Sequence, residues 1–288
     1  DLYGNVICTD TIALPYSNSP GYYRQVTEKI REFIARNCFE ERKILGVSIA
    51  TQGIISPDHE KVTYGKIMDN TGMHLTDFSR NLPYHCHLEH DSKAAACLEL
   101  WNHPELDSAV VFLLNRNLGG AIITNHCIHQ GNSMHSGAIE HICIDPEGAL
   151  CYCGNRGCLE TFCSVDALEQ EAGMSVKDFF QRLREKQSAQ LTENWKNYLD
   201  HLAFAMERER KKIYIEMPLI YDMEQQYPME MNLASYIQEE DIDYLSECIN
   251  LKSPFSLNRK EILVGIHGQY TPAIGAALFY AEQFLNGI

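Results

Sequence analysis

The 288-residue sequence lacks any uninterrupted apolar run that approaches the ~20 residues needed to cross a bilayer. Its first residues, DLYGNVICTD, lack the basic start and apolar middle of a signal peptide. We therefore expect a cytoplasmic protein without membrane contact. The composition is not that of a disordered chain, since 45% of the residues are hydrophobic and 22% are charged. The length suffices for two ordinary domains or one large one.

Basic residues are scarce, because 24 lysines and arginines stand against 39 aspartates and glutamates, a formal net charge of −15 at pH 7. The most basic stretch, Arg208–Lys212, is interrupted by Glu209 and is typical of a solvated helix face. Such a net charge repels polyanions unless the basic residues gather on one face. We expect this chain alone to bind nucleic acid poorly.

Strand and helix patterns alternate along the sequence. Apolar residues at helical spacing predict a helix over residues 20–36, and KILGVSIATQGII predicts a buried strand that runs into a loop at Gln52 and Gly53. A strand over 84–88 leads into a helix whose N-cap region holds Asp91 and Ser92. A strand at 109–114 and later helices repeat this succession, which predicts an α/β fold with two lobes joined near residues 103–108.

The opening LYGNVICTDTIAL predicts two short strands with Gly4 and Asn5 at a hairpin turn. The first arm of this hairpin is almost missing, so we expect further sequence before Asp1 in the natural protein. The remaining strand would be an open sheet edge.

One group of the 11 cysteines is clustered, while most of the others stand singly, as buried free thiols usually do. Within HICIDPEGALCYCGNRGCLE the candidate ligands are His141, Cys151, Cys153 and Cys158. Three thiolates and one imidazole form a closed tetrahedral zinc shell, which is typical of a structural metal. Gly154 and Gly157 would let the short loop fold round the ion.

This pattern leaves alternatives open. The cysteines could be clustered by chance or form a disulfide, and Cys143 or Cys163 could replace one of the four ligands. Glu160 follows Cys158 by two residues, so a metal-bound loop would fix the direction of its carboxylate for hydroxyl recognition. It could equally be a first-turn acidic residue that favours the helix dipole.

The segment CYCGNRGCLE resembles the ROK family (repressors, open reading frames and kinases), whose signature couples Gly-Glu-x-Gly-His to Cys-x-Cys-Gly-x-x-Gly-Cys-x-Glu. SIATQGII, LEHDSKAAACLE and TPAIGAALFYAEQFL resemble three further segments of that family. The resemblance implies two actin-like, hexokinase-like (ribonuclease H-like) α/β lobes, a sugar in the cleft between them and a zinc-stapled loop. It implies lobes at residues 1–105, completed by the helix 272–288, and at 106–271.

The resemblance also implies roles for single residues. Asp91 matches the catalytic aspartate that takes a proton from the sugar hydroxyl in family kinases, although a carboxylate can also bind a hydroxyl without chemistry. His141 and Glu160 match sugar-contacting positions, and Gly53 matches a loop glycine that lies against the sugar.

Two positions on the sugar side depart from the family pattern. His90 stands in place of the Asn before the catalytic aspartate, and it could supply a donor or acceptor to a sugar. Ala138 stands in place of the Glu of Gly-Glu-x-Gly-His, which removes one carboxylate. We expect a ligand other than plain glucose, or weaker binding.

The nucleotide elements depart further. No Asp-x-Gly-Gly-Thr string occurs in the chain, and DLYGNVI matches the strand that follows that string in family kinases. Asn115, Arg116 and Asn117 stand where the second phosphate loop has glycines that let backbone amides approach phosphate. Glu216 and Met217 replace a Gly-Gly pair on the adenosine side. We therefore expect no ATP binding.

These observations favour the sugar-binding and oligomerisation region of a ROK-type transcriptional regulator. The resemblance implies a homodimer or homotetramer, structural zinc, and contact with DNA only through a winged helix-turn-helix segment that lies outside this chain. One alternative is an ATP-dependent sugar kinase with Asp91 as its general base. Another is a degenerate scaffold without a ligand, which Ala138 and His90 would favour.

Overall fold

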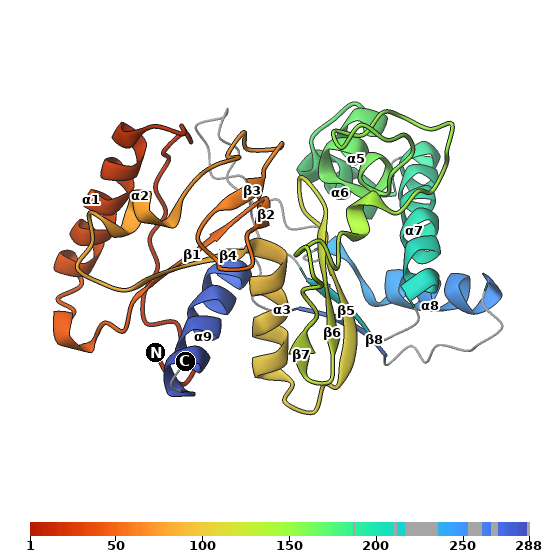
Figure 1. Cartoon of the computed structure of the whole chain (residues 1–288). Helices are drawn as coiled ribbons and strands as arrows, with labels where there is room; N and C mark the ends of the chain where they lie inside the picture. Colours follow the sequence, from red (N-terminus) through yellow and green to blue (C-terminus); the bar gives the residue numbers. More distant parts are fainter. Residues whose placement is uncertain (187, 210–211, 217–235, 253–260, 266–269, 287–288) are drawn as a thin grey trace.

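A computed structural model describes residues 1–186, 188–209, 212–216, 236–252, 261–265 and 270–286. Two groups of strands and helices lie side by side in Figure 1, with helices α3 (Asp91–Asn102) and α9 (Thr271–Leu285) between them. Helix α9 packs against α3 and also against the first group, where the Ser48 hydroxyl donates to the Ala276 carbonyl at 2.8 Å.

The first group holds a parallel strand pair, a short hairpin and two helices. Its elements are α1 (Pro20–Arg36), the 3₁₀ turn Glu41–Lys43, β1 (Val47–Thr51), β2 (Ile54–Ile55), β3 (Val62–Tyr64), α2 (Leu75–Ser79) and β4 (Cys86–His90). Strands β1 and β4 are parallel, with Ile49 opposite Leu88, and β2 and β3 are antiparallel. Helix α1 begins where Ser19 accepts a hydrogen bond from the Tyr22 amide.

Side chains of β4 alternate between two buried environments, as the two-residue period of a strand requires. Leu88 packs in an apolar cluster with Tyr23 and Phe78. His87 and Glu89 share the other face, where the His87 ring lies 5.2 Å from the ring of Phe279 in α9. One face of β4 therefore carries polar groups into a buried region.

The second group is built on a five-stranded sheet of order β7-β6-β5-β8-β9. Its strands are β5 (Ser108–Leu113), β6 (Gly119–Thr124), β7 (Cys127–Ile128), β8 (Lys212–Glu216) and β9 (Ile262–Val264). Strand β5 pairs antiparallel with β6 and parallel with β8, and β8 pairs parallel with β9. The central strand β5 is apolar along its length because it is covered on both faces.

Helices cover the two faces of this sheet. On one face are the 3₁₀ turn Ile139–His141, α4 (Glu160–Cys163), α5 (Val165–Ala172), α6 (Val176–Arg184), α7 (Ala189–Glu209) and α8 (Glu239–Lys252). Val110 and Phe112 belong to the apolar cluster on this face, whereas Ala109 and Val111 pack with Ala96 of α3 on the other. The sheet thus lies between α3 and the α4–α8 layer.

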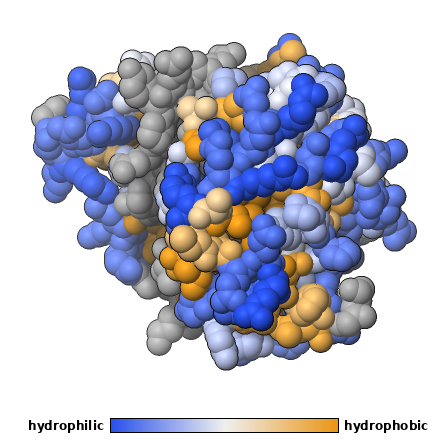
Figure 2. All heavy atoms as spheres, turned by 90° about the vertical axis from the view of Figure 1, so that its left-hand side faces the viewer, coloured by the Kyte–Doolittle hydropathy of each residue, from blue (hydrophilic) through white to orange (hydrophobic). Residues whose placement is uncertain are grey.

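The predicted N-terminal hairpin is wrong. Residues 1–19 contain no strand, and the amide of Gly4 donates to the Asp1 carbonyl within a local turn. Val6 and Ile7 are 50% and 63% exposed, because within the described residues no strand lies beside them to supply ladder hydrogen bonds. Figure 2 shows the molecule from the side of the first group of elements, where hydrophobic residues gather between hydrophilic ones.

The other elements expected above are present. The helical stretch after the cysteine loop is divided at Ser164 into α4 and α5, and the Ser164 hydroxyl caps α5 by accepting from the Ala167 amide. Across the described ranges, no helix combines the length and apolar character that a membrane span requires.

Candidate functional site

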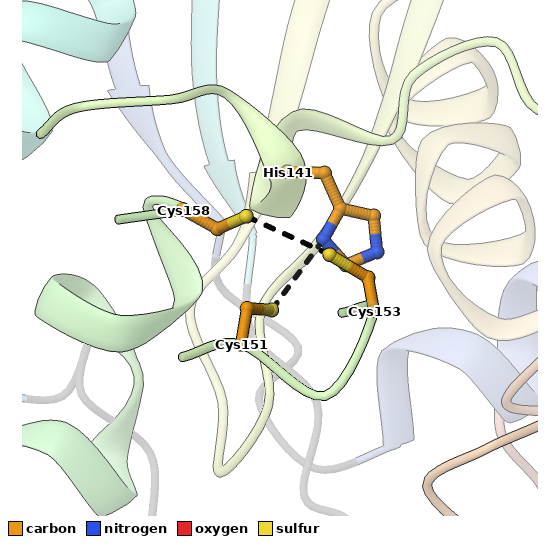
Figure 3. Close-up of side chains that lie close together, drawn as sticks. All are labelled: His141, Cys151, Cys153 and Cys158. Carbon is orange, nitrogen blue, oxygen red and sulfur yellow. Dashed lines mark hydrogen bonds between the residues drawn. The ribbon is translucent and has the colours of Figure 1, made fainter. Parts of the chain in front are cut away.

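The four candidate metal ligands come together in one loop. Figure 3 shows the three thiols and the imidazole pointing toward a common centre. Cys151 Sγ lies 3.8 Å from His141 Nδ1, and Cys153 Sγ lies 3.7 Å from Cys158 Sγ. All four ligand atoms lie within 4.8 Å of one another.

This geometry fits a tetrahedral zinc ion. Zinc–sulfur bonds of ~2.3 Å at tetrahedral angles place two sulfur atoms about 3.8 Å apart. The pair Cys153–Cys158, at 3.7 Å, has this separation without any rearrangement. Burial raises the pKa of the Cys158 thiol to about 12, and a bound cation would offset that cost of ionisation.

The structure contradicts two of the alternatives for this loop, the disulfide and the replacement of a ligand by Cys143 or Cys163. All eleven cysteines are free thiols, so no disulfide is present. Cys143 is exposed, and Cys163 is buried elsewhere with its Sγ directed at the Tyr198 carbonyl. Gly157, with a φ of 62°, lies so close to the Asp145 carbonyl that a Cβ would collide with it. The loop therefore depends on glycine at this position.

A cavity of about 290 Å³ lies beside this cluster and between the two groups of elements. The first group and the start of α3 contribute Gln52, Gly53, Asn70, His90 and Asp91 to its wall. The second group contributes Leu118, Gly119, Glu140, His141, Tyr152 and Cys153. The cavity thus brings together four of the predicted sugar-site residues, and only Glu160 is not among those that line it.

Several polar atoms in the cavity wall have no hydrogen-bond partner within the described part of the chain. These buried atoms are Gln52 Oε1, Asn70 Oδ1, His90 Nδ1 and Glu140 Oε2. A buried polar atom without a partner costs about 1–3 kcal/mol. A ligand that carries several hydroxyl or amide groups would remove this cost at more than one of them.

Asp91 is the first residue of α3, and His90 occupies the N-cap position without a side-chain hydrogen bond. The Asp91 Oδ1 atom accepts from the Ser92 amide at 2.7 Å and from the Ser92 hydroxyl at 3.1 Å. His90 Nδ1 lies 3.5 Å from the same oxygen. These contacts orient one carboxylate oxygen, while the residue as a whole lines the cavity.

Gly53 supplies a close backbone wall of the cavity. Its φ is 101°, and a Cβ at this position would lie 2.8 Å from the Tyr64 carbonyl oxygen. A side chain would therefore both strain the backbone and clash with β3. The turn between β1 and β2 therefore requires glycine at this position of the cavity wall.

Glu140 is a cavity residue that the sequence reasoning missed. It lies two residues after Ala138, in the 3₁₀ turn that also carries His141, and its Oε1 lies 3.8 Å from His141 Nε2. Burial raises the pKa of Glu140 to about 8. The carboxyl group lost at position 138 is thus present at position 140, where the family signature has glycine. That second departure in GAIEH was the signal in the sequence.

Glu160 begins α4 as predicted, but both of its carboxylate oxygens are occupied. Oε1 accepts from the Asn117 side-chain amide and Oε2 accepts from the Leu118 backbone amide, each at 2.7 Å. Burial raises the pKa of Glu160 to about 7, although these two hydrogen bonds act in the opposite direction. Glu160 therefore contacts the loop at residues 115–119 rather than the cavity.

The loop 115–119 is held by its own side chains. The Arg116 guanidinium lies 2.6 Å from Asp166 and 3.9 Å from Glu169, and the Arg116 amide donates to the Asn115 side chain at 2.8 Å. The backbone amides of Arg116 and Leu118 are thus both bound to side chains of the protein itself. Of the adenosine-side pair, Glu216 is the last residue of β8, and Met217 lies outside the described residues.

Comparison with known proteins identifies the family pattern. The pattern described as the ROK family matches residues 15–208, which is more than half of the chain. A second pattern, the PRD domain, matches residues 175–250. The DNA-binding transcriptional dual regulator NagC of Escherichia coli (strain K12) is 25% identical over 302 aligned positions, which cover 100% of this chain and 73% of that protein.

Two further relatives are sugar kinases. The N-acetylmannosamine kinase of Vibrio cholerae is 38% identical over 84 residues, covering 28% of this chain and 29% of the kinase. The crystal structure of a ROK family glucokinase from Streptomyces griseus in complex with glucose and AMPPNP has a TM-score of 0.74 at 17% identity, covering 96% of this chain and 92% of that one. At this identity the likeness shows the fold alone, and it confirms the predicted hexokinase-like class.

Proposed function

The chain belongs to the ROK family, and from this premise we propose that it is the sugar-effector-binding and oligomerisation region of a ROK-type transcriptional regulator without ATP-dependent kinase activity. One observation carries this proposal: Gly53, His90, Asp91 and His141 line one cavity, whereas the loop that would face phosphate is occupied by Glu160.

The cavity supports a sugar derivative as its occupant. It offers two carboxyl groups, from Asp91 and Glu140, together with the unpaired oxygens of Gln52 and Asn70. Carboxyl oxygens accept hydrogen bonds from sugar hydroxyls, and the Glu140 carboxyl group, whose pKa burial raises to about 8, can also donate one. The N-acetylglucosamine repressor of Escherichia coli O6:H1, 25% identical to this chain, and the N-acetylmannosamine kinase are both named for acetamido sugars. We propose an N-acetylhexosamine or its derivative as the ligand class.

The two-lobe arrangement supports a coupling role. We assign residues 1–105 with the helix 272–288 to one lobe and 106–271 to the other. Because the cavity wall comes from both sides, a bound sugar would favour one relative arrangement of the lobes. In a homodimer or homotetramer, that shift would alter how two DNA-binding segments outside this chain are presented.

Zinc would hold the wall of the cavity at the second lobe. The ligands in this proposal are His141, Cys151, Cys153 and Cys158, and two of them also line the cavity. Bound zinc would supply structural crosslinking of the loop. Nδ1 of His141 faces the thiol of Cys151, so metal on that nitrogen would leave Nε2 to donate toward Glu140 or a ligand.

Calorimetric titration with N-acetylglucosamine, N-acetylmannosamine, their 6-phosphates and glucose tests the proposal directly. We expect saturable binding of at least one acetamido sugar and no sugar-dependent consumption of ATP. Binding that is equally strong in Asp91→Asn would place the ligand elsewhere. Absence of binding to all five sugars would instead favour the ligand-free scaffold.

A sugar kinase is the second candidate, because Asp91 lines the cavity in a position where a carboxylate can serve as general base. The kinase proposal requires ATP turnover that disappears in Asp91→Asn. It also requires sugar and nucleotide to bind together, which the occupied loop 115–119 disfavours.

A further inference from the structure

A second group of metal-ligating side chains lies in the first lobe, away from the cysteine loop. His59 comes from the turn between β2 and β3, while His87 and Glu89 share one face of β4. One ligand atom from each lies within 4.8 Å of the other two. Sequence reasoning assigned these three residues no role.

The distances in this group suit a shared cation better than direct hydrogen bonds. Glu89 Oε2 lies 3.5 Å from His59 Nδ1 and 3.7 Å from His87 Nε2. Hydrogen bonds between nitrogen and oxygen are usually 2.7–3.2 Å long. Two ligand atoms bound at ~2.1 Å to one tetrahedral ion lie about 3.4 Å apart.

Two of the candidate ligand atoms are buried and have no hydrogen-bond partner within the described ranges, which is energetically unfavourable. Glu89 is 1% exposed and His87 is 8% exposed. Glu89 Oε2 and His87 Nε2 both lack a hydrogen-bond partner among the residues that the structure describes. Burial tends to raise the pKa of Glu89, but its interactions with His87 and His59 and with the His90 amide hold that pKa below its ordinary value. Two buried ligand atoms thus lack a partner that a bound cation would supply.

The backbone conformation of His59 also supports a cation site. His59 has a φ of 57°, in the left-handed region that non-glycine residues occupy infrequently. Its Nδ1 also lies 3.1 Å from the Leu88 carbonyl. A strained loop residue that directs its ring at two buried ligands is a feature found at functional sites.

We propose that His59, His87 and Glu89 form a binding site for a first-row divalent cation such as zinc, separate from the cysteine loop. Two imidazoles and one carboxylate are a ligand set typical of zinc and its neighbours. Metal binding through Nδ1 of His59 would require the tautomer that carries its proton on Nε2, and it would replace the contact of Nδ1 with the Leu88 carbonyl oxygen. The rings of Phe279 and Tyr280 lie 5.2 and 6.2 Å from the His87 ring and restrict access.

Nearby charges do not fill the site. The Lys93 ammonium interacts with Glu89 through space, but it donates its hydrogen bond to the Met134 carbonyl at 3.0 Å. The Cys97 thiol is buried, and burial raises its pKa well above the ordinary value, so it is neutral. Neither of these groups therefore occupies the space between Glu89 and the two imidazoles.

A cation bound at this site would restrict the motion of the cavity wall. Glu89 directly precedes His90 and Asp91, and the turn that carries His59 connects β2 to β3, whose residues Ile54 and Tyr64 line the cavity. A cation would therefore tie β4 to that turn. We infer a structural site that stiffens the wall of the cavity in the first lobe.

Metal analysis of the chelator-stripped and zinc-reloaded chain tests the site. We expect about two zinc ions per chain, reduced to about one by His59→Asn, by His87→Ala and, independently, by Cys153→Ser. Asparagine tolerates the left-handed backbone, so His59→Asn removes the ligand without a backbone penalty. His126→Asn is the matched control, because His126 has the same φ of 57° in an exposed turn.

Cobalt spectroscopy separates the two sites. Thiolate ligands give intense charge-transfer absorption, whereas a site with nitrogen and oxygen ligands gives only weak visible bands. In Cys153→Ser we expect these weak bands to persist. Adding His59→Asn to that variant should abolish them. Zinc content of one ion in the parent chain, or content unchanged by His59→Asn in folded protein, would overturn the second site. Loss of sugar binding alone would bear only on the proposed function.

Discussion

The two sides of the cavity region differ in what their polar groups contact. In the wall of the cavity, Asn70, His90 and Glu140 each keep a buried atom without a partner among the described residues. In loop 115–119, by contrast, the Leu118 amide and the Asn117 side chain are both bound to Glu160. Unpaired buried groups indicate a place for a ligand, and paired groups indicate that the protein has filled the place itself. The following predictions test this contrast.

The largest effect is expected from Cys153→Ser, which removes one thiolate of the metal loop. Because metal binding and folding of such loops are coupled, the charge-transfer absorption of the cobalt-loaded chain should disappear. We expect at least ~10-fold weaker sugar binding through displacement of His141. Cys143→Ser is the control, since this exposed thiol lies in the same loop outside the cluster. Normal sugar affinity in Cys153→Ser would show that loop and cavity are uncoupled.

Asp91→Asn should have the next largest effect. Loss of a charged acceptor costs about 1.5–3 kcal/mol, which corresponds to roughly 10- to 100-fold weaker sugar binding. Calorimetry of both forms measures this change. Asp107→Asn, an exposed position that does not line the cavity, should bind sugar as the parent does. An unchanged affinity in Asp91→Asn would remove this carboxylate from the sugar side.

Glu140→Gln should weaken binding by roughly 10-fold and change the order of preference among the sugars. The carboxyl oxygen without a partner would be replaced by an amide with different donor and acceptor positions. Titration with the same sugar panel measures the change. Glu147→Gln, an exposed site in the same loop, is the matched control. An identical order of preference would exclude Glu140 as a specificity determinant.

Arg116→Ala should have the smallest effect and should leave sugar binding intact. The ion pair with Asp166 is partly exposed, so its contribution to stability is about 0.5–1 kcal/mol. Denaturant unfolding measures this difference, with Arg42→Ala as an exposed-pair control that should not change stability. Nucleotide binding that appears in Arg116→Ala would show that this side chain alone blocks the phosphate loop.

The helices and strands that were predicted correctly are those whose signals all lie within the element itself. Helix α1 shows helical spacing, a Ser cap and a Pro at its start, and strand β5 is apolar because it is covered on both faces. The N-terminal hairpin failed because a strand requires a neighbour, and strand propensity does not show whether one is present.

The proximity of His141, Cys151, Cys153 and Cys158 was predictable because they lie within one short loop, and the shared cavity of Gly53, His90, Asp91 and His141 follows from family motifs. The hydrogen bonds from residues 117 and 118 to Glu160 were not predictable, because they join positions more than forty residues apart in the sequence. The pairing of His59 with His87 and Glu89 was hidden for the same reason. Alternation along β4 shows that residues 87 and 89 share a face, but nothing local places the earlier turn beside them.

Glu160 connects the two regions compared above. It follows the last cysteine of the metal loop by two residues, and its carboxylate holds the backbone of Leu118. Substituting glycines at 115–117 would therefore leave the Leu118 amide bound to Glu160. Because the residue that closes the cysteine signature also fixes residues 117 and 118, a disturbance of the cysteine cluster would be relayed to a segment more than thirty residues earlier in the chain.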